Sequence, residues 1–291
     1  MKSLVAEFLR RKTLESFDYQ WQNLPTGIAL LSDQWFRENV ARILSEEELC
    51  IDPDWFQGKE VLDAGCGNGR WTYGLLRLGA NVTAVDASQA ACAAIHRTFP
   101  EERRLTVAQA NLLNLPNEIT ERQFDLVFCW GVLHHTGNAE QALKKLAALV
   151  KPDGLMYLYL YGKESLPPRS NAVLGIERLL LLPFSPDIKK RILSFLYPSQ
   201  ALHAAFDSLA TPINDRFEEP TIRHWFSEAG FDRTIRTIDH TELFMKSWRS
   251  GAIVERFFTS PKEPPYWFQL NRQACPDSSQ RLASHGREGK R

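Results

Sequence analysis

The sequence has no excess of either sign of charge, because 35 lysine and arginine residues balance 35 aspartate and glutamate residues in a chain of 291. A neutral balance gives no bulk attraction for nucleic acid or for an anionic membrane surface. We therefore expect neither a nucleic acid nor a membrane as the partner of this protein.

Cysteine and long apolar runs are also scarce. The five cysteines are scattered and form no C-x-x-C pair, which argues against a disulfide framework and against a zinc or other metal site. No apolar run reaches the roughly 18 residues that a membrane span needs, and Leu179–Phe184 is the nearest candidate. The first 21 residues lack the apolar core and small-residue cleavage site of a signal peptide. Together these absences predict a soluble, cytoplasmic protein.

What the chain does have is an alternation of short apolar segments with helical ones between residues 60 and 160. Strands are expected at 60–64, 81–86, 105–107, 124–129 and 155–161, with helices at 70–78, 88–98 and 139–150 and two closing strands at 231–238 and 242–248. This order predicts an α/β fold with a mostly parallel sheet and helices on both faces. The strands lack strict polar alternation, which fits burial on both sides.

Composition divides the chain into five parts. They are an N-terminal helical segment (1–57), a ligand-binding α/β core (58–161), a helical insertion or lid (162–217), the C-terminal end of the core (218–270) and a tail (271–291). Six prolines interrupt the insertion, which is too long for a tight connection. The tail loses its apolar residues, so we expect it to be disordered.

A glycine-rich turn follows the first strand of the core. Its residues are Gly65, Cys66, Gly67, Asn68 and Gly69, and a predicted helix begins directly after them. Glycines in such a turn let the backbone approach a ligand closely, at the strand ends where open parallel sheets bind their ligands. Asp86 ends the next strand, where a carboxylate accepts hydrogen bonds from a ribose diol.

Two residues make this turn differ from the glycine-rich fingerprint of dinucleotide-binding proteins. That fingerprint places its third glycine at position 70, where this chain has Arg70. Asp63 precedes the turn, and its carboxylate would repel a pyrophosphate but suit a ligand that carries a cation. A cationic nucleoside is thus favoured over NAD, and an NAD-linked oxidoreductase is the alternative.

Five segments, taken in order, resemble the motifs of the class I S-adenosylmethionine-dependent methyltransferases. They are Glu60–Gly69, Val85–Asp86, Ala110–Pro116, Phe124–His135 and Leu149–Leu155. The resemblance covers about 100 residues. It implies a Rossmann-like fold with a seven-stranded sheet, S-adenosylmethionine as cofactor with S-adenosylhomocysteine as product, and methyl transfer to a small-molecule acceptor.

The resemblance also implies a role for particular positions. The glycines Gly65, Gly67 and Gly69 would shape the turn around the methionine part of the cofactor, with Asp63 near its amino group, Asp86 at the ribose hydroxyls, Asn111 at the adenine and Trp130 lining the pocket. The neighbouring residues Cys66, Asn68, Ala87 and Leu112 are also expected to bind the cofactor. Asn111 stands where many members have aspartate, although its amide oxygen still accepts a hydrogen bond. Helix capping for the two aspartates, and a plain core position for Trp130, are the structural alternatives.

Two adjacent histidines, His134 and His135, follow the fourth strand. Either would serve as a general base for an acceptor hydroxyl or amine, and closing the turn before the helix at Ala139 is the structural alternative. We expect the acceptor between the N-terminal segment and the insertion, where Tyr19, Tyr161, Arg169, His203, Asp215 and Arg216 are the candidate polar contacts. A cofactor-binding module without catalysis is the further alternative.

Overall fold

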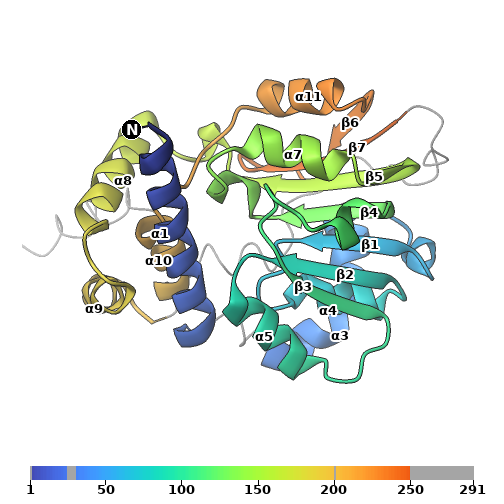
Figure 1. Cartoon of the computed structure of the whole chain (residues 1–291), viewed down its shortest axis with the longest axis horizontal. Helices are drawn as coiled ribbons and strands as arrows, with labels where there is room; N and C mark the ends of the chain where they lie inside the picture. The colour runs from blue at the N-terminus through green and yellow to red at the C-terminus, as the bar shows by residue number, and fades with distance from the viewer. Residues whose placement is uncertain (1, 25–30, 200, 250–291) are drawn as a thin grey trace, which may run out of the picture.

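A seven-stranded sheet forms the centre of the protein, with strand order β3-β2-β1-β4-β5-β7-β6 (Figure 1). The computed structural model describes residues 2–24, 31–199 and 201–249. The strands are β1 (Glu60–Ala64), β2 (Asn81–Asp86), β3 (Leu105–Gln109), β4 (Phe124–Trp130), β5 (Val150–Leu160), β6 (Arg233–Arg236) and β7 (Leu243–Trp248). The first five are parallel, and β7 runs antiparallel to both β5 and β6. The predicted fold class is confirmed.

Helices cover both faces of this sheet (Figure 1). They are α1 (Lys2–Asn23), α3 (Gln34–Arg42), α4 (Arg70–Arg77), α5 (Gln89–Thr98), α6 (Asn117–Thr120), α7 (Ala139–Ala147), α8 (Pro168–Leu181), α9 (Pro186–Leu196), α10 (Leu202–Ala210) and α11 (Glu219–Glu228). Successive residues of a strand point to opposite faces. In β1, Val61 accordingly packs in the core with α3 and α4, and Leu62 packs in the core with α7 and α11. Burial on both faces explains the unbroken apolar runs.

Local signals set several element boundaries. Asp33 accepts a hydrogen bond from the Phe36 N–H and caps α3, and Ser88 accepts one from the Ala91 N–H and caps α5. Each is a side-chain oxygen that satisfies a free N–H group of the first helical turn.

One boundary expectation is wrong, since the strand expected at 155–161 begins earlier, and β5 already includes Val150 and residues 151–154. The ladder between β4 and β5 shifts register between Phe124 and Leu126. At that point a Cβ on Gly154 would stand 2.9 Å from the carbonyl oxygens of both Phe124 and Asp125. A glycine therefore lets the two strands stay close where an ordinary residue would separate them.

A second layer, made of α1 and the helices α8 to α10, stands beside the sheet (Figure 1). Helix α1 forms side-chain hydrogen bonds both to the segment after α10 and to the start of α5. The Ser16 hydroxyl donates to the Ala210 carbonyl after α10, and Asp18 accepts a hydrogen bond from Ser88 at the start of α5. The tail 271–291 and the end of the predicted C-terminal part lie outside the described residues.

Candidate active site

A cavity of about 1310 Å³ lies between the carboxyl ends of the strands and the helices α1 and α10. Nine of the residues expected to bind the cofactor line it: Gly65, Cys66, Gly67, Asn68, Asp86, Ala87, Asn111, Leu112 and Trp130. They come from turns that follow different strands, and parallel strands bring those turns to one edge of the sheet.

The glycine turn tolerates no side chain at two positions. Gly65 has φ +87°, and a Cβ there would stand 2.2 Å from a methyl carbon of Val132. Gly67 has φ +53°, and a Cβ there would stand 2.8 Å from the Trp21 ring of α1. Positive φ and close neighbours both require glycine, so the turn presents bare backbone to the cavity.

The Asp86 carboxylate is held in place by two backbone N–H groups. One oxygen accepts the Gly67 N–H at 2.9 Å, and the other accepts the Ser88 N–H at 2.8 Å. Burial raises the pKa of Asp86, and these backbone bonds oppose that rise. Asn68 is buried beside it, and its amide nitrogen has no hydrogen-bond partner among the described residues. The cavity wall thus offers both acceptors and an unused donor.

Two expected cofactor residues do not line the cavity. Asp63 is buried behind the turn, where it accepts a hydrogen bond from the Thr72 hydroxyl at 2.6 Å. Burial raises its pKa to about 7, although Thr72 lowers it. Gly69 lies at the start of α4 with φ +87°, packed against Ile95. Their contact with a cofactor stays a prediction. In the structure, Asp63 bonds to Thr72 of α4, and Gly69 is the residue at which the turn passes into α4.

Asn111 also lines the cavity, and its side-chain amide oxygen already accepts one hydrogen bond. That oxygen accepts the Leu113 N–H at 2.9 Å within a tight local turn. An amide oxygen has two lone pairs, so one remains for a ligand. Leu112 is buried next to it and supplies an apolar surface.

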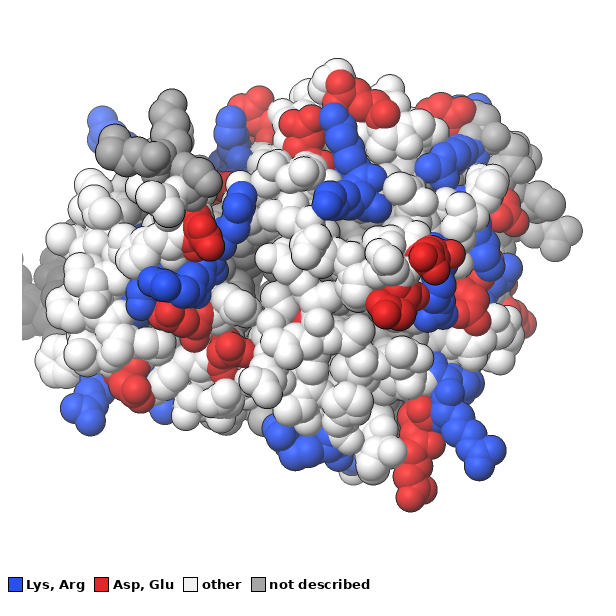
Figure 2. Space-filling model, in the orientation of Figure 1, with Lys and Arg blue, Asp and Glu red and all other residues white. Residues whose placement is uncertain are grey.

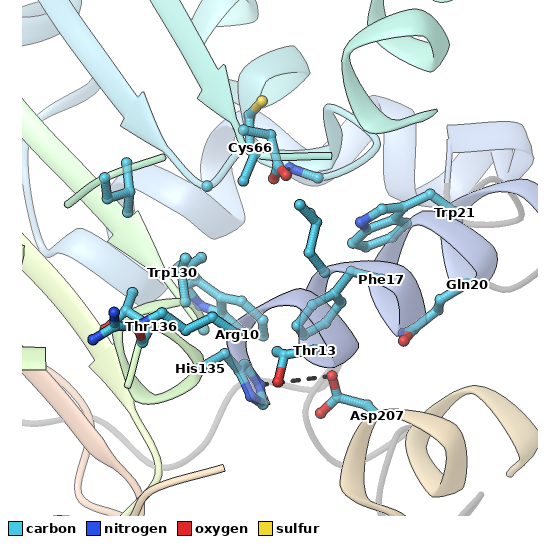
Figure 3. A pocket seen from close by; sticks show the side chains of 18 of the residues that line it. Arg10, Thr13, Phe17, Gln20, Trp21, Cys66, Trp130, His135, Thr136 and Asp207 are labelled. Atoms are coloured by element: carbon cyan, nitrogen blue, oxygen red, sulfur yellow. Dashed lines mark hydrogen bonds and ion pairs between the residues drawn. The ribbon is translucent and has the colours of Figure 1, made fainter. Parts of the chain in front are cut away.

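The other end of the cavity holds three connected polar side chains, His135, Asp207 and Tyr161, of which Figure 3 labels His135 and Asp207. His135 Nδ1 lies 2.7 Å from the Ile213 carbonyl oxygen, which only accepts, so Nδ1 carries the proton. His135 Nε2 then bears the lone pair, 3.8 Å from an oxygen of Asp207. The Tyr161 hydroxyl donates to the other Asp207 oxygen at 2.6 Å. Burial lowers the pKa of His135, which keeps the ring neutral.

His134 takes a different place from its neighbour. It is fully buried, does not line the cavity, and stacks on the Tyr161 ring at 3.9 Å between centroids. Its carbonyl oxygen accepts the Asp215 N–H. Of the two histidines, only His135 lines the cavity, and a catalytic role for His134 stays a prediction.

The particular residues with which α1 lines the cavity were not identified from the sequence. They include Arg10, Thr13, Phe17, Gln20 and Trp21, and Figure 3 shows these five on α1 around the cavity. Arg10, Thr13, Phe17 and Gln20 follow one another at spacings of three or four residues, and Trp21 is four residues from Phe17, which places them on one side of the helix. Of the polar candidates for the acceptor site, Tyr161, His203 and Arg216 line the cavity, whereas Tyr19, Arg169 and Asp215 do not.

The described cysteines Cys50, Cys66, Cys92 and Cys129 are buried and free of disulfides. Among the described residues no group of three or more His, Cys, Asp or Glu side chains is arranged to hold a metal ion.

A family model described as a methyltransferase domain matches residues 61–154. A ubiquinone biosynthesis O-methyltransferase of Azoarcus sp. (strain BH72) is 32% identical over 142 residues, which cover 45% of this chain and 58% of that protein. The corresponding protein of Alkalilimnicola ehrlichii is 36% identical over 132 residues, covering 44% of this chain and 51% of that protein. The matched part thus spans about half the length of these curated relatives.

Among solved structures, an O-methyltransferase family protein from Burkholderia thailandensis superimposes with a TM-score of 0.50 at 15% identity. The match covers 76% of this chain and 62% of that one. At this identity the likeness shows a shared fold.

Proposed function

We propose that the chain is a class I S-adenosylmethionine-dependent methyltransferase that transfers a methyl group to a hydroxyl or amine of a small molecule, and the match of residues 61–154 to a methyltransferase domain supports this. One observation carries this proposal: a single cavity joins the glycine turn and Asp86 to the side chains of His135, Asp207 and Tyr161. A cofactor end and an acceptor end that share one cavity are what a direct group transfer requires.

The residues at the cofactor end fit a nucleoside that carries an amino-acid group. Asp86 offers carboxylate lone pairs for ribose hydroxyls, and the Asn68 amide nitrogen offers an unused donor. Trp130 and Leu112 add apolar surface. When bound, S-adenosylmethionine supplies a methyl group that its sulfonium already activates, so the protein has to position the acceptor and remove its proton.

At the acceptor end, His135 is suited to remove that proton. Its Nδ1 is occupied by the Ile213 carbonyl, so the Nε2 lone pair is the basic atom. The proton of the acceptor hydroxyl or amine would pass to Nε2, and the imidazolium formed would lie beside Asp207. Tyr161 orients Asp207 through its hydroxyl. Because the pKa of His135 is lowered by burial, the basic form is available at neutral pH.

The surface and the helical layer agree with a small acceptor. On the face seen in Figure 2, Lys and Arg side chains are interspersed with Asp and Glu and form no basic stripe. In the described part of the chain, no helix combines the length and apolarity that crossing a membrane requires. The insertion 162–217 and α1 would act as the lid over the acceptor, because α10 and α1 supply the outer wall of the cavity.

The test is methyl transfer from methyl-labelled S-adenosylmethionine to a panel of phenols, alcohols and amines. His135→Gln should lower the rate by roughly 10²- to 10⁴-fold, the usual contribution of a general base, and leave S-adenosylhomocysteine affinity unchanged. His224→Gln is the matched control, because His224 is exposed on α11 and does not line the cavity. Full activity of the His135 variant would remove His135 from the reaction. Tight cofactor binding without transfer to any acceptor would favour the binding module without catalysis.

A further inference from the structure

Three tyrosines, Tyr157, Tyr159 and Tyr161, stand at alternate positions at the end of β5 and directly after it. Alternate residues of a strand point to the same face. The ring of Tyr159 lies between the two ends of the cavity, because it stacks on Trp130 at 4.3 Å between centroids and meets Tyr161 edge-on at 6.0 Å. Phe244 also contacts this ring, at 4.6 Å between centroids. Tyr159 is therefore fixed by aromatic neighbours on several sides.

The hydroxyl of Tyr159 differs from those of its two neighbours. Tyr157 donates a hydrogen bond to Glu48 at 2.6 Å. Tyr161 donates one to Asp207 at the same distance. Within the described residues the Tyr159 hydroxyl makes no hydrogen bond, although only 6% of the residue is exposed and it lines the cavity. A nearly buried hydroxyl is costly to keep unless a ligand or water supplies its partner. The cavity thus contains a positioned hydroxyl whose hydrogen bond is unused.

The charged side chains that share this part of the cavity are paired with other groups. Arg216 lies 3.6 Å from Glu242 and donates to the Gly162 carbonyl oxygen at 3.2 Å. Glu242 also accepts the Gly162 N–H. Burial raises the pKa of Tyr159 well above its usual value, and nearby carboxylates, Glu242 foremost, add to the rise while Arg216 opposes it. The Tyr159 hydroxyl therefore stays protonated and can donate to a neutral oxygen.

We propose that the Tyr159 hydroxyl donates a hydrogen bond to a second oxygen of the methyl acceptor, one that does not itself react, and so selects aromatic acceptors that carry such an oxygen. This inference deepens the proposed function and rests on it. The wall beside His135 is aromatic, since Phe17 meets the His135 ring edge-on at 4.9 Å between centroids. The rings of Tyr159 and His135 each lie 6.0 Å from the ring of Tyr161, so a single small ring can contact both. A site built to donate a hydrogen bond discriminates against an analogue without the acceptor atom, because its own polar group is then left unpaired.

The first experiment measures kcat/KM of the full chain for phenol, for aniline and for the three ring-hydroxylated isomers of each. The wild type should prefer at least one hydroxylated isomer over its parent by roughly tenfold. Tyr159→Phe removes only the hydroxyl, so it should lower kcat/KM about tenfold for that isomer and leave the parent within about twofold. The number of reactive groups is the same for both proteins and cancels in this comparison.

Tyr73→Phe is the matched control, because Tyr73 stacks on Phe99 and does not line the cavity. Calorimetric titration should show S-adenosylhomocysteine affinity within about twofold for all three proteins. An equal loss of kcat/KM for both kinds of acceptor, or no loss, would overturn the inference. A loss of cofactor affinity in Tyr159→Phe would overturn it as well, because the hydroxyl would then serve the cofactor. Absence of methylation by the wild type would count against the proposed function instead.

The second experiment needs no acceptor and tests whether the Tyr159 hydroxyl is unpaired. Chemical denaturation compares Tyr159→Phe with Tyr157→Phe. Tyr157→Phe should lower the denaturation midpoint, because it takes a hydrogen bond from the buried Glu48 carboxylate. Tyr159→Phe should leave the midpoint unchanged or raise it, since no bond within the protein is lost. Equal falls for the two variants would show that the Tyr159 hydroxyl is already bonded, and would overturn the inference.

Discussion

Replacing Asp86 by asparagine should weaken the binding of S-adenosylhomocysteine. The two oxygens of Asp86 accept the N–H groups of Gly67 and Ser88, and the lone pairs that remain would accept the ribose hydroxyls. Asparagine replaces one of these oxygens by an amide NH₂, which only donates. Either the backbone N–H or a ribose hydroxyl then faces a donor and loses its bond.

The size of the effect follows from the lost bond. A hydrogen bond to a charged group contributes about 1.5–3 kcal/mol net. Since about 1.4 kcal/mol corresponds to a tenfold change, the dissociation constant should rise roughly 10- to 100-fold. Without ligand the asparagine NH₂ also faces one of the two backbone N–H groups, so the thermal midpoint should fall as well, and affinity is compared at a temperature where both proteins are folded.

Calorimetric titration measures this difference, with Asp18→Asn as the matched control. Asp18 is a carboxylate that also bonds to Ser88, but it does not line the cavity. Its variant should bind within about threefold of the wild type, well under one factor of ten. Unchanged affinity for Asp86→Asn, or an equal loss for Asp18→Asn, would refute the assignment of Asp86 to the ribose.

Two further predictions concern stability. Gly65→Ala should lower the unfolding free energy by about 2–4 kcal/mol in chemical denaturation, because it combines a positive φ with a clash against Val132, and Val132→Ala in the same chain should recover part of the loss. Burial raises the pKa of Asp63 from 3.8 to about 7, so its contribution to stability is full below pH 4 and is lost as the pH rises through 7. Asp63→Asn should therefore reduce the fall in unfolding free energy between pH 5 and 7 by about 2–3 kcal/mol, and an unchanged pH dependence would contradict the shift.

The sequence was sufficient for the sheet and for the residues that line the cavity around the glycine turn, because both depend on local patterns. The strand from Val61, the glycines after it and Asp86 follow one another within one β-α-β unit, so their spacing along the chain determines their spacing in the fold. Asp207 was missed for the opposite reason. It reaches the cavity from α10, and which face of that helix turns toward the cavity depends on its packing against α1, α8 and α9 rather than on a motif.

The same distinction applies to the histidine pair. Both residues follow β4, and the sequence could not choose between them. The Ile213 carbonyl and the ring of Tyr161 separate their roles, because the first fixes the His135 ring toward the cavity and the second covers His134. Both partners lie in or next to the insertion 162–217, far along the chain.

The central claim is that this cavity binds S-adenosylmethionine and not a dinucleotide. Calorimetric titration of the purified chain with S-adenosylmethionine, S-adenosylhomocysteine and NAD, run in parallel, tests it most directly. The account predicts micromolar binding of both adenosyl ligands, about −8 kcal/mol, and no binding of NAD. Binding of NAD without the adenosyl ligands would contradict it and would assign the cavity to hydride transfer.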